Sequence, residues 1–325
     1  MASGRKRQRR LVGLALAVLL ITGAMACSSK NEQAGTGPNI WGLTATRLVV
    51  DLVPLEVDLP VGVSSIVGHT FWDGSEPVWV TYGDKSGFTP GGGPLYFFSG
   101  LTGEELGTVG NKVVKAILDQ GRLYWLERPG PEQSRLLAAY PGPGIDGVGL
   151  IGWPAEIIDF DVHGSWLVVT TLDKTIIYQQ TGGAAVEKHR LGRGGAVALA
   201  DLDNSGDLEL VLRDAMGADF YVYRLQDNAW ELLWNTASEG GERFDGLILA
   251  EDLTGDGVME IYAGDMSGRM AQLVLTADGL AEKKVKHPGQ EGTFRVFNYY
   301  HHKALVLWCW WDSEEGAVYT IKSNE

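Results

Sequence analysis

The chain has 325 residues, of which 45% are hydrophobic, and this content argues against a wholly disordered protein. Its formal net charge is −14, although five of its 27 basic residues lie within the first ten positions. The rest of the chain sets 22 basic residues against 41 acidic ones. Such a balance repels nucleic acid and anionic lipid, so it excludes nucleic acid as a partner of the folded body.

The first 26 residues have the pattern of an export signal. The basic run RKRQRR precedes the apolar run LVGLALAVLLITGAMA, which is short for a membrane-spanning helix and ends next to Cys27. The letters AMAC resemble a bacterial lipobox, although Ala24 stands where leucine is usual. The resemblance implies that Cys27 is lipidated and becomes the new N-terminus. The alternative is an ordinary signal peptide whose A-x-A cleavage site happens to precede a cysteine.

Residues 27–44 follow as a polar stretch rich in glycine and serine, which is typical of a flexible tether. We therefore expect an extracytoplasmic, membrane-anchored lipoprotein whose folded domain covers residues 45–325. The anchor could lie in an outer membrane or on the outer face of a single membrane. The other cysteine of the sequence is Cys309, so a lipidated Cys27 leaves no internal disulfide.

A repeat is visible in the second half of the chain. The stretch AVALADLDNSGDLELVLRD (196–214) aligns without a gap with GLILAEDLTGDGVMEIYAGD (246–265). Asp201 falls on Asp252 and Glu209 falls on Glu260, each at an offset of 51 residues. A period in this range with strand-like content indicates the blades of a β-propeller.

Further strands extend this pattern along the chain. Each blade is expected to have a second strand that ends at an acidic residue, and a third strand rich in aromatic and β-branched residues. These ends recur about every 46 residues, at Asp84, Glu127, Asp173, Asp214, Asp265 and Asp312. The last blade lacks an outer strand, whereas residues 46–53 form a spare one, so their pairing would close the ring. The sequence predicts an all-β propeller of six four-stranded blades, with five or seven blades, or a pair of β-sandwiches, as alternatives.

Residues 194–276 resemble two FG-GAP/VCBS-type repeats, which occur in integrin α-subunit propellers and in many bacterial surface proteins. The family's loop reads D-x-[DN]-x-[DN]-G-x-x-[DE], and the resemblance implies a structural Ca²⁺ ion bound by positions 1, 3, 5, 7 and 9. In the first loop these positions are Asp201, Asp203, Ser205, Asp207 and Glu209. In the second loop they are Asp252, Thr254, Asp256, Val258 and Glu260.

The chemistry of these loops agrees with a metal ion. Ca²⁺ takes six to eight hard oxygen ligands, and carboxylates at this spacing repel one another without a cation. Each loop has one weakened position, Ser205 or Thr254, so we expect a modest affinity, on the order of 0.1–1 mM. One or both loops could hold an ion. The alternative is that they are solvated acidic turns without metal.

A candidate binding surface lies in the last blade, at Tyr299, Tyr300, His301, His302 and Trp311. Adjacent strand residues face opposite sides, so a metal shared by the two histidines is not favoured. The sequence contains no nucleophile elbow, zinc-protease motif or phosphate loop. We therefore expect a non-enzymatic scaffold that binds a protein or a glycan. The alternatives are a propeller enzyme acting on extracellular glycans or small alcohols, and a purely structural component of the cell envelope.

Overall fold

A computed structural model describes residues 49–50, 52–55, 66–82, 93–130, 133–153, 156–181, 183–215, 219–226, 229–235, 248–253, 257–264, 270–276, 279–285, 292–299, 303–310 and 316–321. The predicted signal peptide, the lipidation site Cys27 and the tether lie outside these ranges. The chain divides into two units, Met1–Pro38 and Asn39–Glu325, and every described residue belongs to the second. Within these ranges there is no helix, and so none that could span a membrane.

The described strands form six four-stranded groups, which we call blades 1 to 6. Blade 1 contains β3 (Ile66–Trp72), β4 (Glu76–Tyr82), β5 (Gly93–Ser99) and the first part of β6 (Glu105–Asp119). Blade 2 contains the rest of β6, β7 (Arg122–Gly130), β8 (Gln133–Ala139) and β9 (Val148–Trp153). Blade 3 contains β10 (Asp159–His163), β11 (Trp166–Thr170), β12 (Thr175–Thr181) and β13 (Ala184–Leu191).

The second half of the chain continues the series. Blade 4 contains β14 (Gly195–Ala200), β15 (Glu209–Asp214), β16 (Phe220–Gln226) and β17 (Ala229–Asn235). Blade 5 contains β18 (Ile248–Glu251), β19 (Glu260–Gly264), β20 (Met270–Thr276) and β21 (Gly279–Val285). Blade 6 contains β22 (Gly292–Tyr299), β23 (Lys303–Trp310), β24 (Gly316–Ile321) and β2 (Leu52–Leu55).

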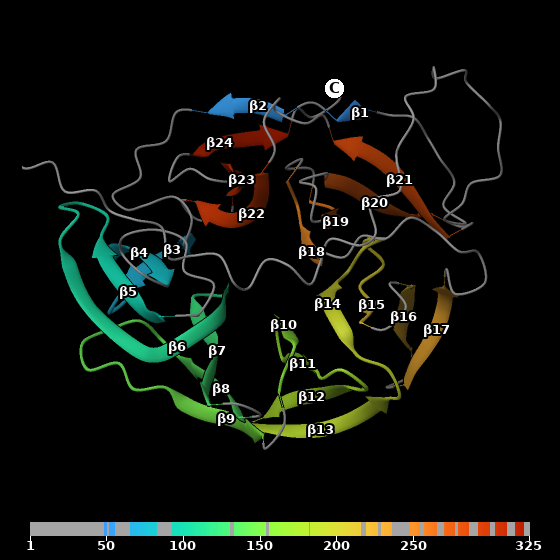
Figure 1. Ribbon diagram of the computed structural model, residues 1–325, viewed down its shortest axis with the longest axis horizontal. Helices are drawn as coiled ribbons and strands as arrows, with labels where there is room; N and C mark the ends of the chain where they lie inside the picture. The colour runs from blue at the N-terminus through green and yellow to red at the C-terminus, as the bar shows by residue number, and fades with distance from the viewer. Residues whose placement is uncertain are drawn as a thin grey trace, which may run out of the picture. The chain divides into compact units, whose positions relative to one another are not determined.

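Neighbouring strands within each blade are antiparallel, and the blades follow one another in chain order. Figure 1 shows the first strands β10, β14, β18 and β22 toward the middle of this unit, and the fourth strands β13, β17 and β21 at its rim. Blades 1, 2 and 6 join in one sheet because β6 pairs with both β5 and β7, and because β22 makes one parallel pairing with β3. This arrangement is a β-propeller, as predicted. The number of blades in the whole chain stays a prediction.

The core lies between the blades, because blades 2, 3 and 4 each bury their two faces against different neighbours. In β11, Leu167 and Val169 pack against blade 2, whereas Val168 packs against blade 4. In β15, Leu212 faces blade 3 and Val211 faces blade 5. Successive side chains of a strand point to opposite faces, so these middle strands are apolar at consecutive positions. Each such buried side chain contributes about 1.5–3 kcal/mol.

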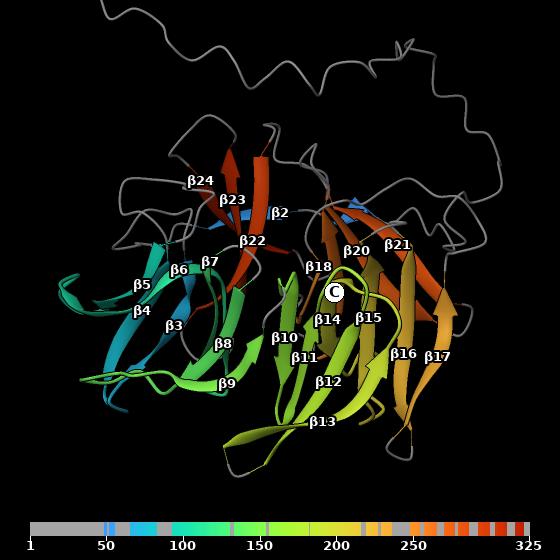
Figure 2. The same ribbon diagram turned by 60° about the horizontal axis from the view of Figure 1, so that its bottom comes forward.

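Hydrogen bonds join the first strands of blades 3 and 4, β10 and β14. Figure 2 shows both strands in a second view. β10 and β14 are both edge strands of their sheets, so some of their backbone groups need partners outside the sheet. Asp159 and Asp161 on β10 accept hydrogen bonds from the N–H groups of Val197 (3.0 Å) and Leu199 (2.7 Å) on β14. Lys115 of β6 donates in turn to the Asp159 carboxylate at 2.5 Å. These bonds link blades 2, 3 and 4 near the middle of the unit.

The chain enters blade 4 through two glycines that touch the backbone of other strands. A Cβ atom on Gly194 would lie 1.8 Å from the carbonyl oxygen of Thr171, and one on Gly195 would lie 1.9 Å from that of Arg213. Gly195 also has a φ of +150°. A residue with a side chain would therefore force β14 away from its neighbours.

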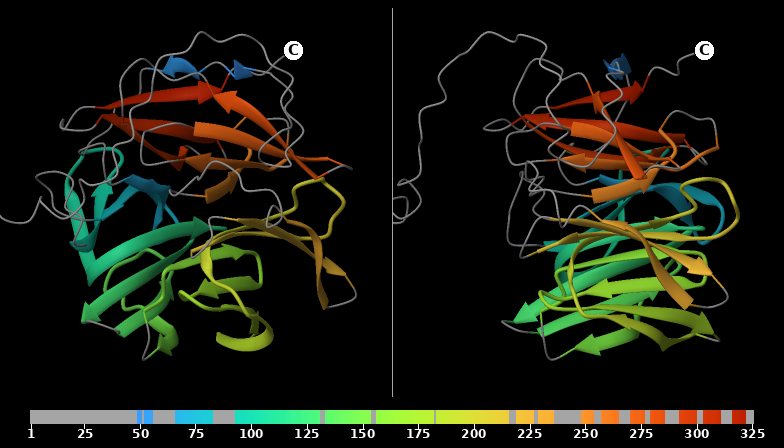
Figure 3. Two further views of the ribbon diagram at one scale, coloured as in Figure 1. Left: turned by 45° about the vertical axis from the view of Figure 1, so that its right-hand side comes forward. Right: turned by 90° about the vertical axis from the view of Figure 1, so that its right-hand side faces the viewer.

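An N-terminal strand completes the last blade, as predicted. β2 pairs with β24 in antiparallel register, from Leu52 opposite Ile321 to Leu55 opposite Val318. One detail of the predicted strand 46–53 differs, because β1 (Val49–Val50) pairs with β21 of blade 5, in parallel. Both rim strands would otherwise be free edges, and Figure 3 shows β1 and β2 on their outer sides. The segment 49–55 therefore covers the rims of two blades.

Deleting residues 49–55 should expose the edges of β21 and β24. Each backbone hydrogen bond that is lost should cost roughly 0.5–1.5 kcal/mol, and the open edges should promote aggregation. Hydrogen exchange measures this directly, as faster exchange of the amides in 279–285 and 316–321. A deletion of similar length in the predicted tether, residues 30–36, is the control. Unchanged exchange in 316–321 would contradict the pairing.

Candidate functional site

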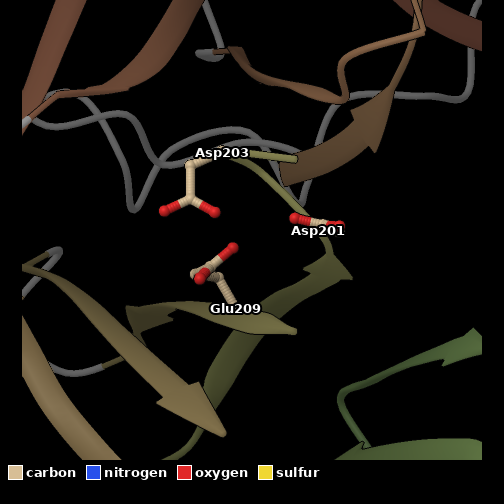
Figure 4. Close-up of side chains that lie close together, drawn as sticks. All are labelled: Asp201, Asp203 and Glu209. Atoms are coloured by element: carbon tan, nitrogen blue, oxygen red, sulfur yellow. The ribbon is translucent and has the colours of Figure 1, made fainter. Parts of the chain in front are cut away.

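The first acidic loop joins β14 to β15, where the first strand of blade 4 turns into the second. Asp201 follows β14 directly, and Glu209 is the first residue of β15. Carboxylate oxygens of Asp201, Asp203 and Glu209 lie within 4.8 Å of one another. Figure 4 shows the carboxylates of Asp203 and Glu209 facing each other, with Asp201 beside them. The structure thus brings together three of the five predicted ligand residues, and Ser205 and Asp207 are exposed, as is Asp203.

Carboxylates hold the main chain of this loop in place. Asn204 and Gly206 adopt φ values of 55° and 90°, a region that glycine enters freely and asparagine enters more readily than most residues. Asp201 accepts hydrogen bonds from the N–H groups of Ser205 (3.0 Å) and Gly206 (2.9 Å). Asp203 also accepts one from the Ser205 N–H, at 3.1 Å. Such side-chain-to-backbone bonds are typical of a tight turn.

A cation from the next strand contacts the same carboxylates. Arg224 on β16 lies opposite Glu209 on β15, and its Nε donates to Glu209 Oε1 at 2.5 Å. Its Nη2 donates to Asp203 Oδ2. Glu209 is fully buried, and the Leu202 N–H donates to its second oxygen at 2.8 Å. The loop is therefore a compact cluster of hydrogen-bonded and oppositely charged groups.

The environment shifts the pKa values of this cluster in opposite directions. Burial raises the pKa of Glu209, and the hydrogen bonds from Leu202 and Arg224 offset only part of that rise. Partial burial also acts to raise the pKa of Asp203, but hydrogen bonds from Ser205 and the charge of Arg224 outweigh it, so its net pKa is lowered. The exposed end of the loop therefore keeps its negative charge more firmly than the buried end.

The second acidic loop repeats the main-chain arrangement of the first. The Gly257 N–H donates to Asp252 Oδ2 at 2.8 Å, and the Leu253 N–H donates to Glu260 Oε2 at 3.3 Å. The Tyr262 hydroxyl also donates to Glu260, at 3.0 Å. The other predicted ligands of this loop are the partly buried Val258 and, outside the described residues, Thr254 and Asp256.

The two loops differ in how well they suit a calcium ion. In the first loop, Arg224 already bonds two of the three clustered carboxylates, so Ca²⁺ would have to compete with a guanidinium group. In the second loop, Ile261 pairs with Leu273, which places Val274 at the register position that corresponds to Arg224. The second loop therefore has an apolar residue where the first has a cation.

The predicted surface in the last blade is only partly within the described chain. Tyr299 ends β22, where its backbone pairs with Lys303. The predictions on Tyr300, His301, His302 and Trp311 fall outside the described residues. This surface stays a prediction.

Sequence reasoning missed a group of acidic residues near the first strands of different blades. Asp119 ends β6, Asp161 lies on β10 and Glu251 ends β18. Protein atoms surround the Glu251 carboxyl, and this loss of hydration raises its pKa to about 7; the charges of Asp161, Asp252 and Asp119 add to the rise. Burial likewise raises the pKa of Asp161 to about 6, although Lys115 opposes it. These residues are too far apart in the chain for a motif to reveal them.

Two exposed apolar side chains were also missed. Leu101 in the β5–β6 turn is 76% exposed, and Tyr140 after β8 is 70% exposed. Strands alternate in direction, so the β3–β4 and β5–β6 turns lie at the same end of blade 1. Asp73 in the β3–β4 turn donates its N–H to the carbonyl oxygen of Pro141 at 3.0 Å, which places Tyr140 at this end too. The turn between the first and second strand of a blade lies at this end. Both acidic loops are turns of this type.

Comparisons with known proteins agree with the fold and do not identify a family. No protein-family model matches the chain, and no curated protein matches it. A chain in a crystal structure of the mitotic checkpoint complex shares 12% identity at a TM-score of 0.52, covering 94% of this chain and 100% of that chain. A Lactobacillus plantarum protein shares 14% identity at a TM-score of 0.51, covering 78% and 80%.

The β-propeller domain of Myceliophteria thermophila Cps50 (Swd1) shares 10% identity at a TM-score of 0.49, covering 79% of this chain and 84% of that domain. The first two likenesses, at identities this low, speak to the fold alone. The strand topology defines the class of this protein as a β-propeller protein. Its resemblance to FG-GAP/VCBS repeats stays a prediction.

The raised pKa of Asp161 predicts a pH-dependent stability. An unfolded aspartate titrates near its ordinary pKa of about 3.9, so between about pH 4 and pH 6 the folded state binds more protons than the unfolded state. The contribution of Asp161 to the free energy of unfolding should therefore fall as pH rises through that range. Asp161→Asn should remove this contribution. Between pH 4.5 and pH 7, the free energy of unfolding in urea should therefore fall by on the order of 1–2 kcal/mol more in wild type than in Asp161→Asn.

The charged groups that face Asp161 are Lys115, Asp159 and Glu251. The backbone N–H groups of Val162 and Leu199 donate hydrogen bonds to its carboxylate. Asp73→Asn, in an exposed turn, is the control for a general effect of removing a carboxylate. If Asp161→Asn and Asp73→Asn changed the pH dependence equally, the assignment to Asp161 would be wrong.

Proposed function

We propose that this protein is a non-enzymatic, extracytoplasmic β-propeller, anchored to a membrane through a lipid on Cys27, that binds a partner at the end of its blades carrying the acidic loops. The observation behind the binding proposal is the exposure of Leu101 and Tyr140 at that end, at 76% and 70%. Apolar side chains exposed at the same end of a protein can become covered when a partner associates there.

The chemistry of this end favours a protein partner over a glycan. Leu101 has neither a hydrogen-bonding group nor a ring that could stack on a sugar, whereas tyrosine suits either kind of partner. The β-propeller supports such a role because its turns present side chains from several blades on one rigid end. Low sequence identity to other propellers carries no information on which partner is bound.

We also propose that the second acidic loop binds a Ca²⁺ ion. Its support is the resemblance of Asp252 to Glu260 to the FG-GAP/VCBS loop, together with the shared main-chain hydrogen bonds of the two loops. An ion there would pin the β18–β19 turn and so stiffen the end of the blades that we propose for binding. The role is structural.

The binding proposal predicts that Leu101→Ser combined with Tyr140→Ser abolishes partner capture. The test is a pull-down with the full chain from detergent-solubilised native membranes, compared by quantitative mass spectrometry. Leu172→Ser is the matched control, because Leu172 is 55% exposed but lies in the β11–β12 turn at the opposite end of its blade. Equal capture by the double variant and wild type would place the binding site elsewhere.

The anchoring proposal predicts that Cys27→Ala releases the protein from membranes or leaves its signal peptide uncleaved. Buried acyl chains contribute about 0.8 kcal/mol per CH₂ group, so a multiply acylated cysteine holds firmly while alanine cannot be acylated at all. Membrane fractionation and intact-mass measurement of the mature chain test this. A mature wild-type protein without lipid, or one that retains residues before Cys27, would refute the anchor.

A further inference from the structure

Every carboxylate oxygen of the clustered residues Asp201, Asp203 and Glu209 already accepts a hydrogen bond. Four of these six oxygens bond backbone N–H groups of the loop itself. The remaining two, Asp203 Oδ2 and Glu209 Oε1, both bond Arg224. Arg224 therefore donates to the two carboxylate oxygens that receive no hydrogen bond from the loop's backbone.

The position of Arg224 is fixed by the sheet and not by a flexible surface contact. Its residue lies opposite Glu209 in the register between β15 and β16, and its side chain is only 19% exposed. The planar guanidinium group can donate to two carboxylates at once, which a metal ion would otherwise bridge. The positive charge thus lies where the loop's negative charges meet.

We infer that Arg224 is the resident cation of the first loop, and that this loop keeps its conformation without a metal ion. A Ca²⁺ ion bound by Asp203 and Glu209 would displace the guanidinium group and leave a largely buried arginine without its counter-charges. Removing one partner of such a buried pair is strongly unfavourable. The loop therefore departs from the family whose ligand pattern it resembles.

The second loop supplies the natural comparison. Val274 occupies the register position of Arg224, and Tyr262, which donates to Glu260, stands where blade 4 has Val211. The backbone of the two loops is thus supported in the same way, whereas the residue types opposite Glu209 and Glu260 in the sheet register differ. The inference on Arg224 does not require that the second loop binds calcium.

The experiment compares full-length wild type with Arg224→Val, Asp201→Ala and Asp203→Ala, all in detergent. Arg190→Val is the matched control, because Arg190 forms an exposed ion pair with Glu187 on β13. Melting is followed in EDTA, and Ca²⁺ binding is titrated by calorimetry. We expect Arg224→Val to melt about 5–10 °C below Arg190→Val in EDTA, because only the former breaks a buried pair.

The calcium titration gives the second readout. We expect Asp201→Ala and Asp203→Ala to bind as many Ca²⁺ ions as wild type, since neither residue holds one; two variants are used so that misfolding of one leaves the other. Loss of one Ca²⁺ equivalent in either would overturn the inference, as would equal melting of Arg224→Val and Arg190→Val. If wild type binds no Ca²⁺, the proposed calcium in the second loop fails, and the melting comparison alone decides the role of Arg224.

Discussion

Burial of both faces of a blade, which the described side chains show for blades 2, 3 and 4, is the constraint on which this fold depends. A sheet with two apolar faces is unstable in water by itself, and it needs a neighbour on each side. Val168 and Val169 show this in one strand, because they pack against the blades on opposite sides of blade 3. A row of such blades would leave its first and last faces bare, so the chain has to bring its ends together. The pairing of β2 with β24 serves that need.

The sequence predicts those features of the fold that depend on local patterns. The apolar runs before Asp173 and Asp214 contain second strands, although β11 ends earlier, at Thr170. The offset between Asp201 and Asp252 marks a repeated blade. The pairing of Val49–Val50 with β21 could not be predicted in the same way. This pairing depends on which outer strand lies close to residues 49–50 in the folded protein. Long-range pairings of this kind leave no periodic signal in the residues that make them.

The acidic loops show a similar limit at the level of a site. The spacing of Asp201, Asp203 and Glu209 and the turn at Gly206 place their carboxylate oxygens close together. The motif says nothing about Arg224, which approaches from another strand through the register of the sheet. A ligand motif predicts which oxygen atoms a loop offers. It does not predict which positively charged side chains other strands place beside those oxygens.

The closing strand also imposes an order of assembly. Leu52 and its partner Ile321 are separated by nearly the whole folded domain, and such distant pairings form slowly because long loops must be ordered first. In an exported chain, the N-terminal strand reaches the far side of the membrane long before the C-terminal residues arrive. It has to remain unpaired, yet soluble, through most of translocation. If the chain is exported as we propose, the first strand to cross the membrane is the last to pair.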